Sequence, residues 1–317
     1  MRPEELHLRI DAYLAARQAM GFALRAERTL LHDFARFLEA QGNVSPIRAQ
    51  SALDWACQSS SQRGVSGQAA RLTMARQFLL HLRATDPETE VPEYHLLAAG
   101  RRPKPYLFSD EEIAAILKEA RQAGPAGSLR PHTLATFIGL LASTGVRVGE
   151  ALRLKIFEVQ LAVGSPHLLI RETKFHKSRL VPVHPTTAQM LKDYTQQRAR
   201  LHYDCLSDAF LISEQGAHLP LGATEVWFAR LVRRLGLQSA QGQRRPCLQC
   251  FRHTFAVRRI EAWYEQGVDV PRMLPHLSVY LGHVRPQESY WYLTATPELL
   301  TGAAQKFEAY AAAGGER

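Results

Sequence analysis

Residues 281–293 read LGHVRPQESYWYL, and the rest of the chain can be interpreted outward from this stretch. Its Leu-Gly-His turn is followed by Tyr292, nine positions after His283. A tyrosine phenol can act as a nucleophile and hold a covalent intermediate, but it needs cationic groups to receive the charge that develops on its target. Tyr290 is a second phenol close by, and a tyrosine such as Tyr292, taken alone, is far more often a packing aromatic, here beside Trp291. The stretch therefore predicts a reaction site only if the chain supplies cations for it.

Two arginines upstream lie in short blocks that suit such a role. Arg147 lies in TGVRVGE, in the first turn expected of a helix that continues ALRL, and Arg252 lies in FRHTF. A cation at the start of a helix is electrostatically unfavourable, so Arg147 indicates a function or a buried partner, for which Glu150 is the candidate. A planar guanidinium offers donors that match phosphate oxygens. The two arginines are therefore candidate phosphate ligands.

A third block, TKFHKSRLVPV, lies where two short strands are expected to meet. It contains Lys174, Lys177 and Arg179. A cationic turn of this kind can enter a DNA groove, and a lysine with an ordinary pKa of about 10.4 is protonated and can give a proton to a leaving oxygen. The block predicts that one of its lysines is a proton donor and that Lys177 and Arg179 are DNA contacts.

The order and approximate separations of these blocks resemble the tyrosine recombinase (phage integrase) family over about residues 107–293. The resemblance implies that Arg147 and Arg252 clamp the scissile phosphate of DNA and that Lys174 protonates the departing 5′ oxygen. The helical first part of the chain resembles the core-binding domain of that family. The closing segment SYWYLTATPELL resembles recombinases carried by mobile elements.

The same resemblance assigns the remaining roles. His283 would donate to a non-bridging oxygen or assist proton transfer, and Tyr292 would attack phosphorus to form a 3′-phosphotyrosyl bond. Because the bond energy is kept in that ester, the resemblance implies no cofactor, neither ATP nor a metal. It implies site-specific recombination that serves integration, excision or transposition. The implied partners are specific sites in double-stranded DNA, further subunits in a homotetramer on synapsed DNA, and other recombinases of the same element.

One position departs from the family pattern. Residue 249 is Gln in CLQCFRHTF, where the family usually has a His three residues before its second arginine. An amide can donate a hydrogen bond to phosphate, but it cannot shuttle a proton or carry charge. Two readings therefore stay open, an active recombinase and an accessory DNA-binding subunit weakened at Gln249. A topoisomerase-like enzyme of type IB and a basic helical protein unrelated to DNA are further alternatives.

The positive charge of the chain is concentrated after residue 100. Residues 1–100 hold 11 Lys and Arg against 11 Asp and Glu, whereas residues 101–317 hold 28 against 19, which is the whole formal charge of +9. Such an excess indicates a polyanionic partner. No apolar run has the length of a membrane span and the first residues are not a signal peptide, so we expect a cytoplasmic, nucleoid-associated protein without a membrane partner. Cys247 and Cys250 lack the further ligands of a structural zinc site, so no metal is predicted.

The hydrophobic pattern predicts two domains. Residues 1–96 show helical spacing throughout and predict a DNA-binding helical bundle. Residues 97–107, LAAGRRPKPYL, predict a linker because prolines, a glycine and three cations fall close together. The cations, which are candidate contacts to DNA phosphates, are Arg101, Arg102 and Lys104.

Residues 108–317 predict a catalytic domain that is mostly helical with a small antiparallel sheet. The expected strands are 156–161, 167–172 and 180–183, between helices that include one starting at a Ser109–Glu112 capping box. A final helix, 297–312, would either dock on a neighbouring subunit or fold back on its own domain. The fold class is therefore mainly α with a small antiparallel sheet (α+β).

Overall fold

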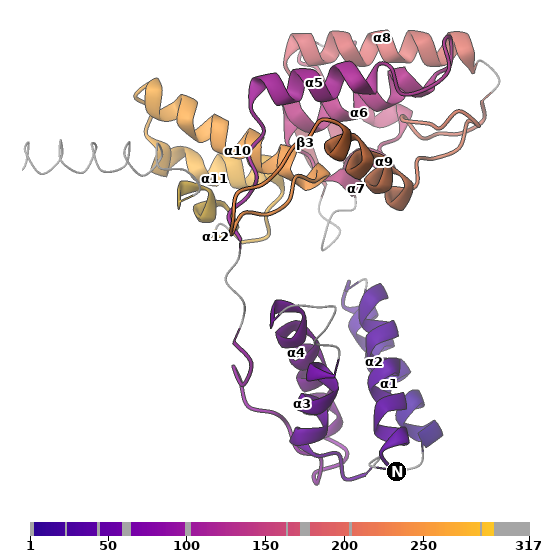
Figure 1. The fold of residues 1–317 in the computed structure, drawn as a ribbon, viewed down its shortest axis with the longest axis vertical. Helices are drawn as coiled ribbons and strands as arrows, with labels where there is room; N and C mark the ends of the chain where they lie inside the picture. Colours follow the sequence, from indigo (N-terminus) through magenta and orange to yellow (C-terminus); the bar gives the residue numbers. More distant parts are fainter. Residues whose placement is uncertain are drawn as a thin grey trace, which may run out of the picture. The chain divides into compact units, whose positions relative to one another are not determined.

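The computed structural model describes residues 3–294, apart from residues 23, 43–44, 59–64, 99–102, 163, 172–177, 203–204 and 286. Its backbone divides into two compact units, Met1–Arg102 and Pro103–Arg317, which Figure 1 draws as ribbons. The division falls within the segment for which the sequence predicts a linker. The fold class is confirmed, because helices dominate and a small antiparallel sheet lies in the second unit.

The described part of the first unit is a bundle of helices. They are α1 (Pro3–Ala19), α2 (Arg25–Ala40), α3 (Ala49–Cys57) and α4 (Val65–Leu82). Their apolar faces meet in one core whose large side chains include Phe34, Trp55 and Phe78. The Arg71 guanidinium lies 3.8 Å from the centroid of the Trp55 ring, and the Trp55 indole donates to Asp33 at 3.1 Å. The Trp55 indole and the Arg71 guanidinium therefore have polar partners inside the bundle.

Most of the described helices lie in the second unit. Its described helices are α5 (Asp110–Ala120), α6 (Arg130–Thr144), α7 (Val148–Arg153), α8 (Pro185–Leu201), α9 (Leu221–Arg234), α10 (Leu248–Glu265), α11 (Val270–Leu281) and α12 (Gln287–Tyr290). Helix α5 begins at the expected capping box, where the Ser109 hydroxyl accepts from the Glu112 N–H at 3.2 Å and the Glu112 carboxylate accepts from the Ser109 N–H at 2.9 Å. Helices α5, α6 and α8 lie side by side (Figure 1).

The sheet is antiparallel and runs in the order β1 (Val159–Gln160), β2 (His167–Ile170) and β3 (Arg179–Pro182). The expected strand 156–161 is wrong in its first half, because Ile156–Glu158 forms a 3-10 turn, η1. The turn forms because the Glu158 carboxylate accepts from the Lys155 backbone N–H at 2.8 Å and draws the chain back.

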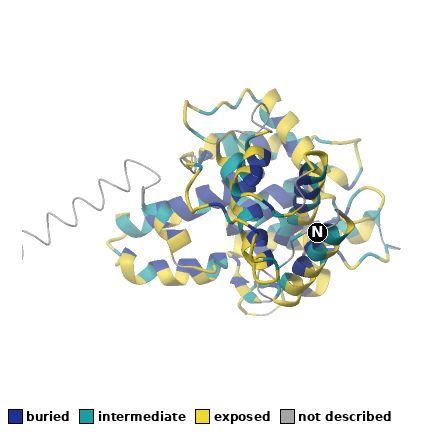
Figure 2. Ribbon diagram, turned by 90° about the horizontal axis from the view of Figure 1, so that it is seen from below, coloured by how far each residue is buried: buried dark blue, intermediate teal, exposed yellow. Residues whose placement is uncertain are grey.

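Two cores hold the second unit together. One joins α5–α9 and the sheet, and the other packs α10 and α11 against η2 (Trp291–Thr294). Figure 2 shows the buried residues on the inward sides of the helices. The expected helix 297–312 lies outside the described residues. Among the helices that the structure describes, none is long and apolar enough to cross a membrane.

Candidate active site

Arg252 lies at the centre of the candidate site, on α10, and is 3% exposed. Its two terminal nitrogens donate to backbone carbonyls of other segments, Nη1 to Gly145 at 2.8 Å and Nη2 to Leu281 at 2.7 Å. Burial, followed by the neighbouring charge of Arg147, lowers the pKa of Arg252 to about 10, so it stays protonated at neutral pH. A buried cation therefore ties α10 to the end of α6 and the end of α11.

Gly145 is a glycine because the turn between α6 and α7 demands one. It ends α6 in the left-handed region, with φ of 62°. A Cβ there would lie 2.6 Å from a ring carbon of Phe255, closer than such atoms approach. The bare backbone lets α10 pack closely and turns the Gly145 carbonyl toward Arg252.

Arg147 does not lie in the first turn of a helix, as the sequence predicts, but immediately before α7 with an extended backbone. The expected partner is confirmed: the Arg147 Nη1 donates to the Glu150 carboxylate at 2.8 Å, and its backbone N–H donates to the same group at 2.9 Å. Its Nη2 donates to the Gly282 carbonyl at 2.7 Å. Arg147 and Arg252 thus bond the consecutive carbonyls of Leu281 and Gly282, at the Leu-Gly-His turn.

Arg179 has a different position from the one expected of a surface DNA contact. Its side chain is 9% exposed, and its guanidinium pairs at two points with Glu150, Nη1 at 3.1 Å and Nη2 at 2.7 Å. Its Nε donates to the Tyr280 carbonyl at 2.8 Å. Burial raises the pKa of Glu150, but hydrogen bonds and charge from Arg179, then Arg147, outweigh it and bring the pKa to about 2. Glu150 is therefore an anion that holds two arginines.

His283 follows Gly282, which ends α11 with φ of 68°. The His283 Nδ1 lies 2.7 Å from the Ser289 hydroxyl. Burial, followed by the charges of Arg252 and Arg147, lowers the pKa of His283 to about 3. The imidazole is therefore neutral at physiological pH, and the same burial and charges make it a weak base.

Tyr292 lies in η2 and is 2% exposed. Its ring centroid is 6.0 Å from that of His283 and 5.7 Å from that of His253. Tyr290 is 50% exposed, and Tyr280 stacks on Phe255. Among these three phenols, Tyr292 is thus the one that the structure places against His283.

The proton donor candidate and three DNA-contact candidates lie outside the described residues, namely Lys174, Lys177, Arg101 and Arg102. Lys104 is described and exposed, and its carbonyl accepts from the backbone N–H of Arg244 at 2.8 Å. Gln249 is half-buried in the first turn of α10.

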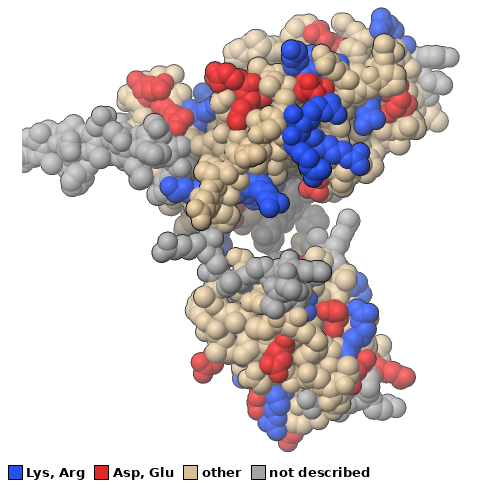
Figure 3. Space-filling view, viewed as in Figure 1, with Lys and Arg blue, Asp and Glu red and all other residues tan. Residues whose placement is uncertain are grey.

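Gln249 and Arg147 line one open groove with a volume of about 770 Å³. Arg153 of α7 and Arg244, which precedes α10, line it too and are both exposed. Figure 3 shows basic side chains gathered on part of one face of the second unit, with acidic side chains beside them. Sequence reasoning missed Arg153 and Arg244, although the RR pair at 244–245 is a local signal. The groove provides cations beside the candidate site.

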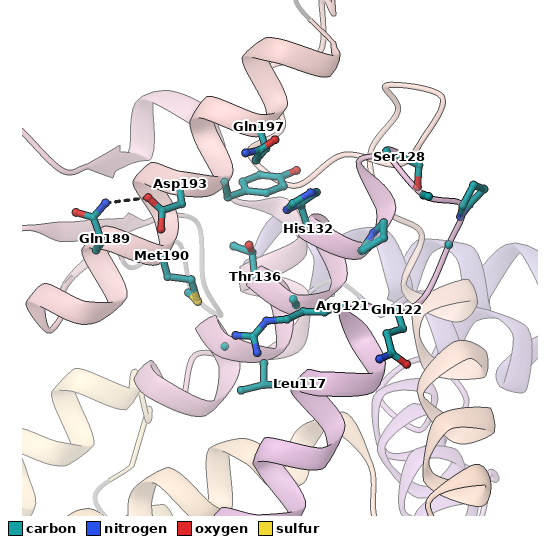
Figure 4. Close-up of a pocket in the computed structure, with 18 of the residues that line it drawn as sticks. Leu117, Arg121, Gln122, Ser128, His132, Thr136, Gln189, Met190, Asp193 and Gln197 are labelled. Atoms are coloured by element: carbon teal, nitrogen blue, oxygen red, sulfur yellow. Dashed lines mark hydrogen bonds between the residues drawn. The ribbon is translucent and has the colours of Figure 1, made fainter.

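A larger hollow of about 1010 Å³ lies elsewhere, among α5, α6 and α8 (Figure 4). Its wall carries the Gln189 amide, which donates to the Asp193 carboxylate at 2.8 Å. None of the candidate active-site residues that the structure describes lines this hollow. This hollow is therefore separate from the cluster of arginines.

Comparison with known proteins identifies the family. A family model described as the phage integrase family matches residues 107–298, more than half of the chain. The chain belongs to the phage integrase family. A Sinorhizobium fredii protein named "Putative integrase/recombinase y4rB" is 39% identical over 305 residues, which cover 94% of this chain and 96% of that protein. The tyrosine recombinase XerD of Bradyrhizobium diazoefficiens is 27% identical, over 77% of this chain and 79% of its own.

Solved structures of integrases and recombinases share the fold. The Tn1549 transposon integrase in complex with transposon right end DNA superimposes with a TM-score of 0.66 at 14% identity, and the match covers 96% of this integrase-family chain and 99% of the other. The XerH site-specific recombinase bound to palindromic difH substrate gives a TM-score of 0.63 at 18% identity, over 89% and 79% of the two chains. At these identities the likeness concerns the fold.

Proposed function

We propose that this chain is a site-specific recombinase that cleaves and rejoins duplex DNA through a 3′-phosphotyrosyl intermediate at Tyr292. One observation carries the proposal: Arg147 and Arg252 bond consecutive carbonyls of the turn that leads to His283, and Tyr292 packs against that imidazole. Four groups that the chemistry needs thus converge from separate segments. Membership of the phage integrase family supports the same function.

The reaction is an exchange of one phosphoester for another. The Tyr292 oxygen bonds to phosphorus while the bond from phosphorus to the 5′ oxygen breaks, and Lys174 protonates that leaving oxygen. Arg147 and Arg252 stabilise the negative charge that spreads over the non-bridging oxygens. Rejoining reverses these steps, with a 5′ hydroxyl as nucleophile and Tyr292 as leaving group. Neither direction needs an external energy source, since the ester conserves the bond energy.

His283 is suited to take the phenolic proton. Its pKa of about 3 in the DNA-free protein keeps it neutral at physiological pH but also makes it a weak base. A bound phosphate brings negative charge near the same arginines and would move the pKa of His283 back toward its ordinary range. Ser289, 2.7 Å from Nδ1, holds the ring and leaves Nε2 for the reacting groups.

The phenol must become accessible before it can attack. Tyr292 is 2% exposed and packs in the core formed by α10, α11 and η2. Helix α12 and η2 are short elements of four residues each, so moving them disturbs little regular structure. We propose that DNA binding shifts this segment and brings the Tyr292 oxygen to the phosphate held by Arg147 and Arg252.

We place the whole reaction in a multi-subunit DNA complex of a mobile element. The first unit would grip DNA as a core-binding domain, with Arg101, Arg102 and Lys104 near the backbone. Support comes from neighbours of the same fold that are described as a transposon integrase on transposon end DNA and as a lambda integrase tetramer bound to a Holliday junction. We expect a homotetramer on synapsed sites, acting in the cytoplasm at the nucleoid.

A suicide-substrate assay tests this function. Nicked duplexes that tile the DNA around the gene are incubated with the full chain, and denaturing gels report covalent protein–DNA adducts. We expect an adduct with the native protein and none with Tyr292→Phe, which keeps DNA binding because it removes a single oxygen. An adduct that survives in Tyr292→Phe but disappears in Tyr290→Phe would refute the assignment of the nucleophile.

The runner-up function is an accessory DNA-binding subunit, favoured by Gln249 at the position where the family has His. It predicts specific binding without an adduct under every condition. A topoisomerase-like activity would instead relax supercoiled DNA as a monomer without two specific sites. Assays of covalent adduct, DNA binding and DNA relaxation on the same protein preparation distinguish the three functions.

A further inference from the structure

Two cysteines form a close pair at the beginning of α10. Cys247 is the residue immediately before the helix and Cys250 lies in its first turn. Their sulfur atoms are 3.4 Å apart. A disulfide needs about 2.05 Å between the sulfurs, so the side chains have only about 1.4 Å to close between them. The backbone already joins them, because the Cys250 N–H donates to the Cys247 carbonyl at 2.8 Å.

The two thiols differ in the way that a reactive pair requires. Cys247 is half-buried and lines the groove beside Gln249, whereas Cys250 is fully buried. A hydrogen bond from Cys250 lowers the pKa of Cys247 to about 6, helped by the charge of Arg244 and the backbone N–H groups at the helix start. The same contact raises the pKa of Cys250. The outer sulfur is therefore a thiolate at neutral pH and the inner sulfur a thiol.

We propose that Cys247 and Cys250 are a redox modification site that closes to a disulfide when the protein meets hydrogen peroxide. The Cys247 thiolate attacks one peroxide oxygen, which forms a sulfenic acid and releases hydroxide. The Cys250 sulfur then attacks the sulfenic sulfur, the S–S bond forms, and the hydroxyl group of the sulfenic acid leaves as water with the Cys250 proton. The two sulfurs lose two electrons to the peroxide, and a dithiol reductant such as dithiothreitol reverses the change.

Closing the pair changes the charge of the groove. The thiolate of Cys247 lies in a groove that Arg147, Arg153 and Arg244 line, and there it repels a phosphate. The disulfide is neutral, so oxidation removes one negative charge without removing a cation. This consequence rests on the proposed function, because it assumes that DNA phosphates enter the groove. Oxidation is then expected to strengthen binding of duplex DNA by about three- to tenfold at low salt.

Thiol mapping tests the site without any use of DNA. The full reduced protein is treated with hydrogen peroxide at a small molar excess, alkylated and digested, and the peptides are weighed. We expect the peptide that contains both Cys247 and Cys250 to lose the mass of two hydrogen atoms, while Cys57 and Cys205 remain open to alkylation. Dithiothreitol should restore the pair. The proposal is overturned if Cys57 or Cys205 is oxidised before the pair. It is also overturned if both cysteines of the pair are still fully alkylated after peroxide treatment.

Two variants locate the roles of the two sulfurs. Cys250→Ala should stop at a sulfenic acid on Cys247, which a dimedone probe detects and which should form more slowly, because the hydrogen bond that favours the thiolate is lost. Cys247→Ser should give neither product. Cys205→Ser is the matched control and should oxidise at the pair like the native protein. Equal oxidation of Cys247→Ser and the native protein would show that the pair does not react as proposed.

The pH dependence of alkylation adds a check on the attacking sulfur. Cys247 should react with iodoacetamide half-maximally at a pH below the midpoint of an ordinary thiol, which is about 8.5. The charged groups that share its groove are Arg147, Glu150, Arg153, Glu225 and Arg244. Arg244→Gln should move this midpoint to higher pH, because it removes a positive charge beside Cys247. A midpoint near the ordinary thiol value in the native protein would contradict the assignment of Cys247 as the attacking sulfur.

DNA affinity is measured separately on the oxidised and reduced protein. A three- to tenfold increase on oxidation that is absent in Cys247→Ser would support the link to the groove. If the disulfide forms and affinity does not change, the modification site stands and its effect on DNA binding is refuted. If the protein binds no DNA in either state, it is the proposed function that fails.

Discussion

Arg179 of β3 and Glu150 of α7 form a two-point ion pair between side chains that are 9% and 3% exposed. The pair lies behind Arg147, which bonds the same carboxylate. A third bond, from Arg179 to the Tyr280 carbonyl, attaches the end of α11. The position of Arg147, which we expect to bind the scissile phosphate, thus depends on Arg179, which we do not expect to contact DNA.

The first prediction concerns Arg179→Gln. It leaves the buried Glu150 carboxylate with a single charged partner, so the free energy of unfolding should fall by about 3 kcal/mol. Arg171→Gln is the matched control, because the Arg171 side chain is 53% exposed and lies 3.5 Å from Glu158. Urea unfolding and DNA binding are measured for both. A loss of DNA affinity at unchanged stability would instead restore Arg179 as a DNA contact.

The second prediction concerns Gly282→Ala. The new Cβ would lie 2.6 Å from Nη1 of Arg179, and the residue has a φ of 68° that disfavours any side chain. Gly267→Ala is the control, since Gly267 has a φ of 69° with nothing within 4 Å of the added atom. Both should pay the backbone strain of about 1 kcal/mol. Only Gly282→Ala should lose adduct formation as well, and equal losses would show that the contact with Arg179 does not matter.

The third prediction concerns the pH dependence of stability through His283. Its pKa of about 3 in the folded protein lies below the value of about 6.5 in an unfolded chain, so between these values the unfolded state binds more protons. The free energy of unfolding should therefore fall as pH drops, by about 1–2 kcal/mol between pH 6.5 and 5. The measure is the difference between the native protein and His283→Asn across that range. Parallel stability curves would show that the imidazole titrates normally.

The sequence predicts some residues of the candidate site and not others. The sequence predicts one cluster of candidate site residues, because each member lies in a short pattern with a recognisable spacing. These residues are Arg147, Arg252, His283 and Tyr292. The role of Arg179 could not be predicted, because it depends on a contact to the Tyr280 carbonyl 101 positions away.

The same limit applies to smaller features of the fold. The helices follow from apolar periodicity, and the capping box at Ser109 marks where α5 begins. The expected strand 156–161 fails in its first half because a local hydrogen bond of Glu158 competes with the sheet. The exposed arginines of the groove, Arg153 and Arg244, come from separate segments that line the same groove, which no single stretch of sequence reveals.

The last prediction concerns Gln249, and it separates the two leading functions. We expect the native protein to form the phosphotyrosyl adduct slowly, because a Gln amide still donates to a phosphate oxygen where a His would also supply charge or a proton. Losing one such charged donor typically costs on the order of a hundredfold in rate, which slows a reaction without ending it.

Gln249→His should then form adduct faster, since Gln249 lines an open groove of about 770 Å³ and an imidazole has room there. Gln249→Ala is the matched control and should be slower than the native protein, because it removes the donor altogether. The time course of adduct on a suicide substrate measures all three. Adduct from Gln249→His alone would mean that the native residue switches cleavage off, and the accessory-subunit function would then replace the recombinase.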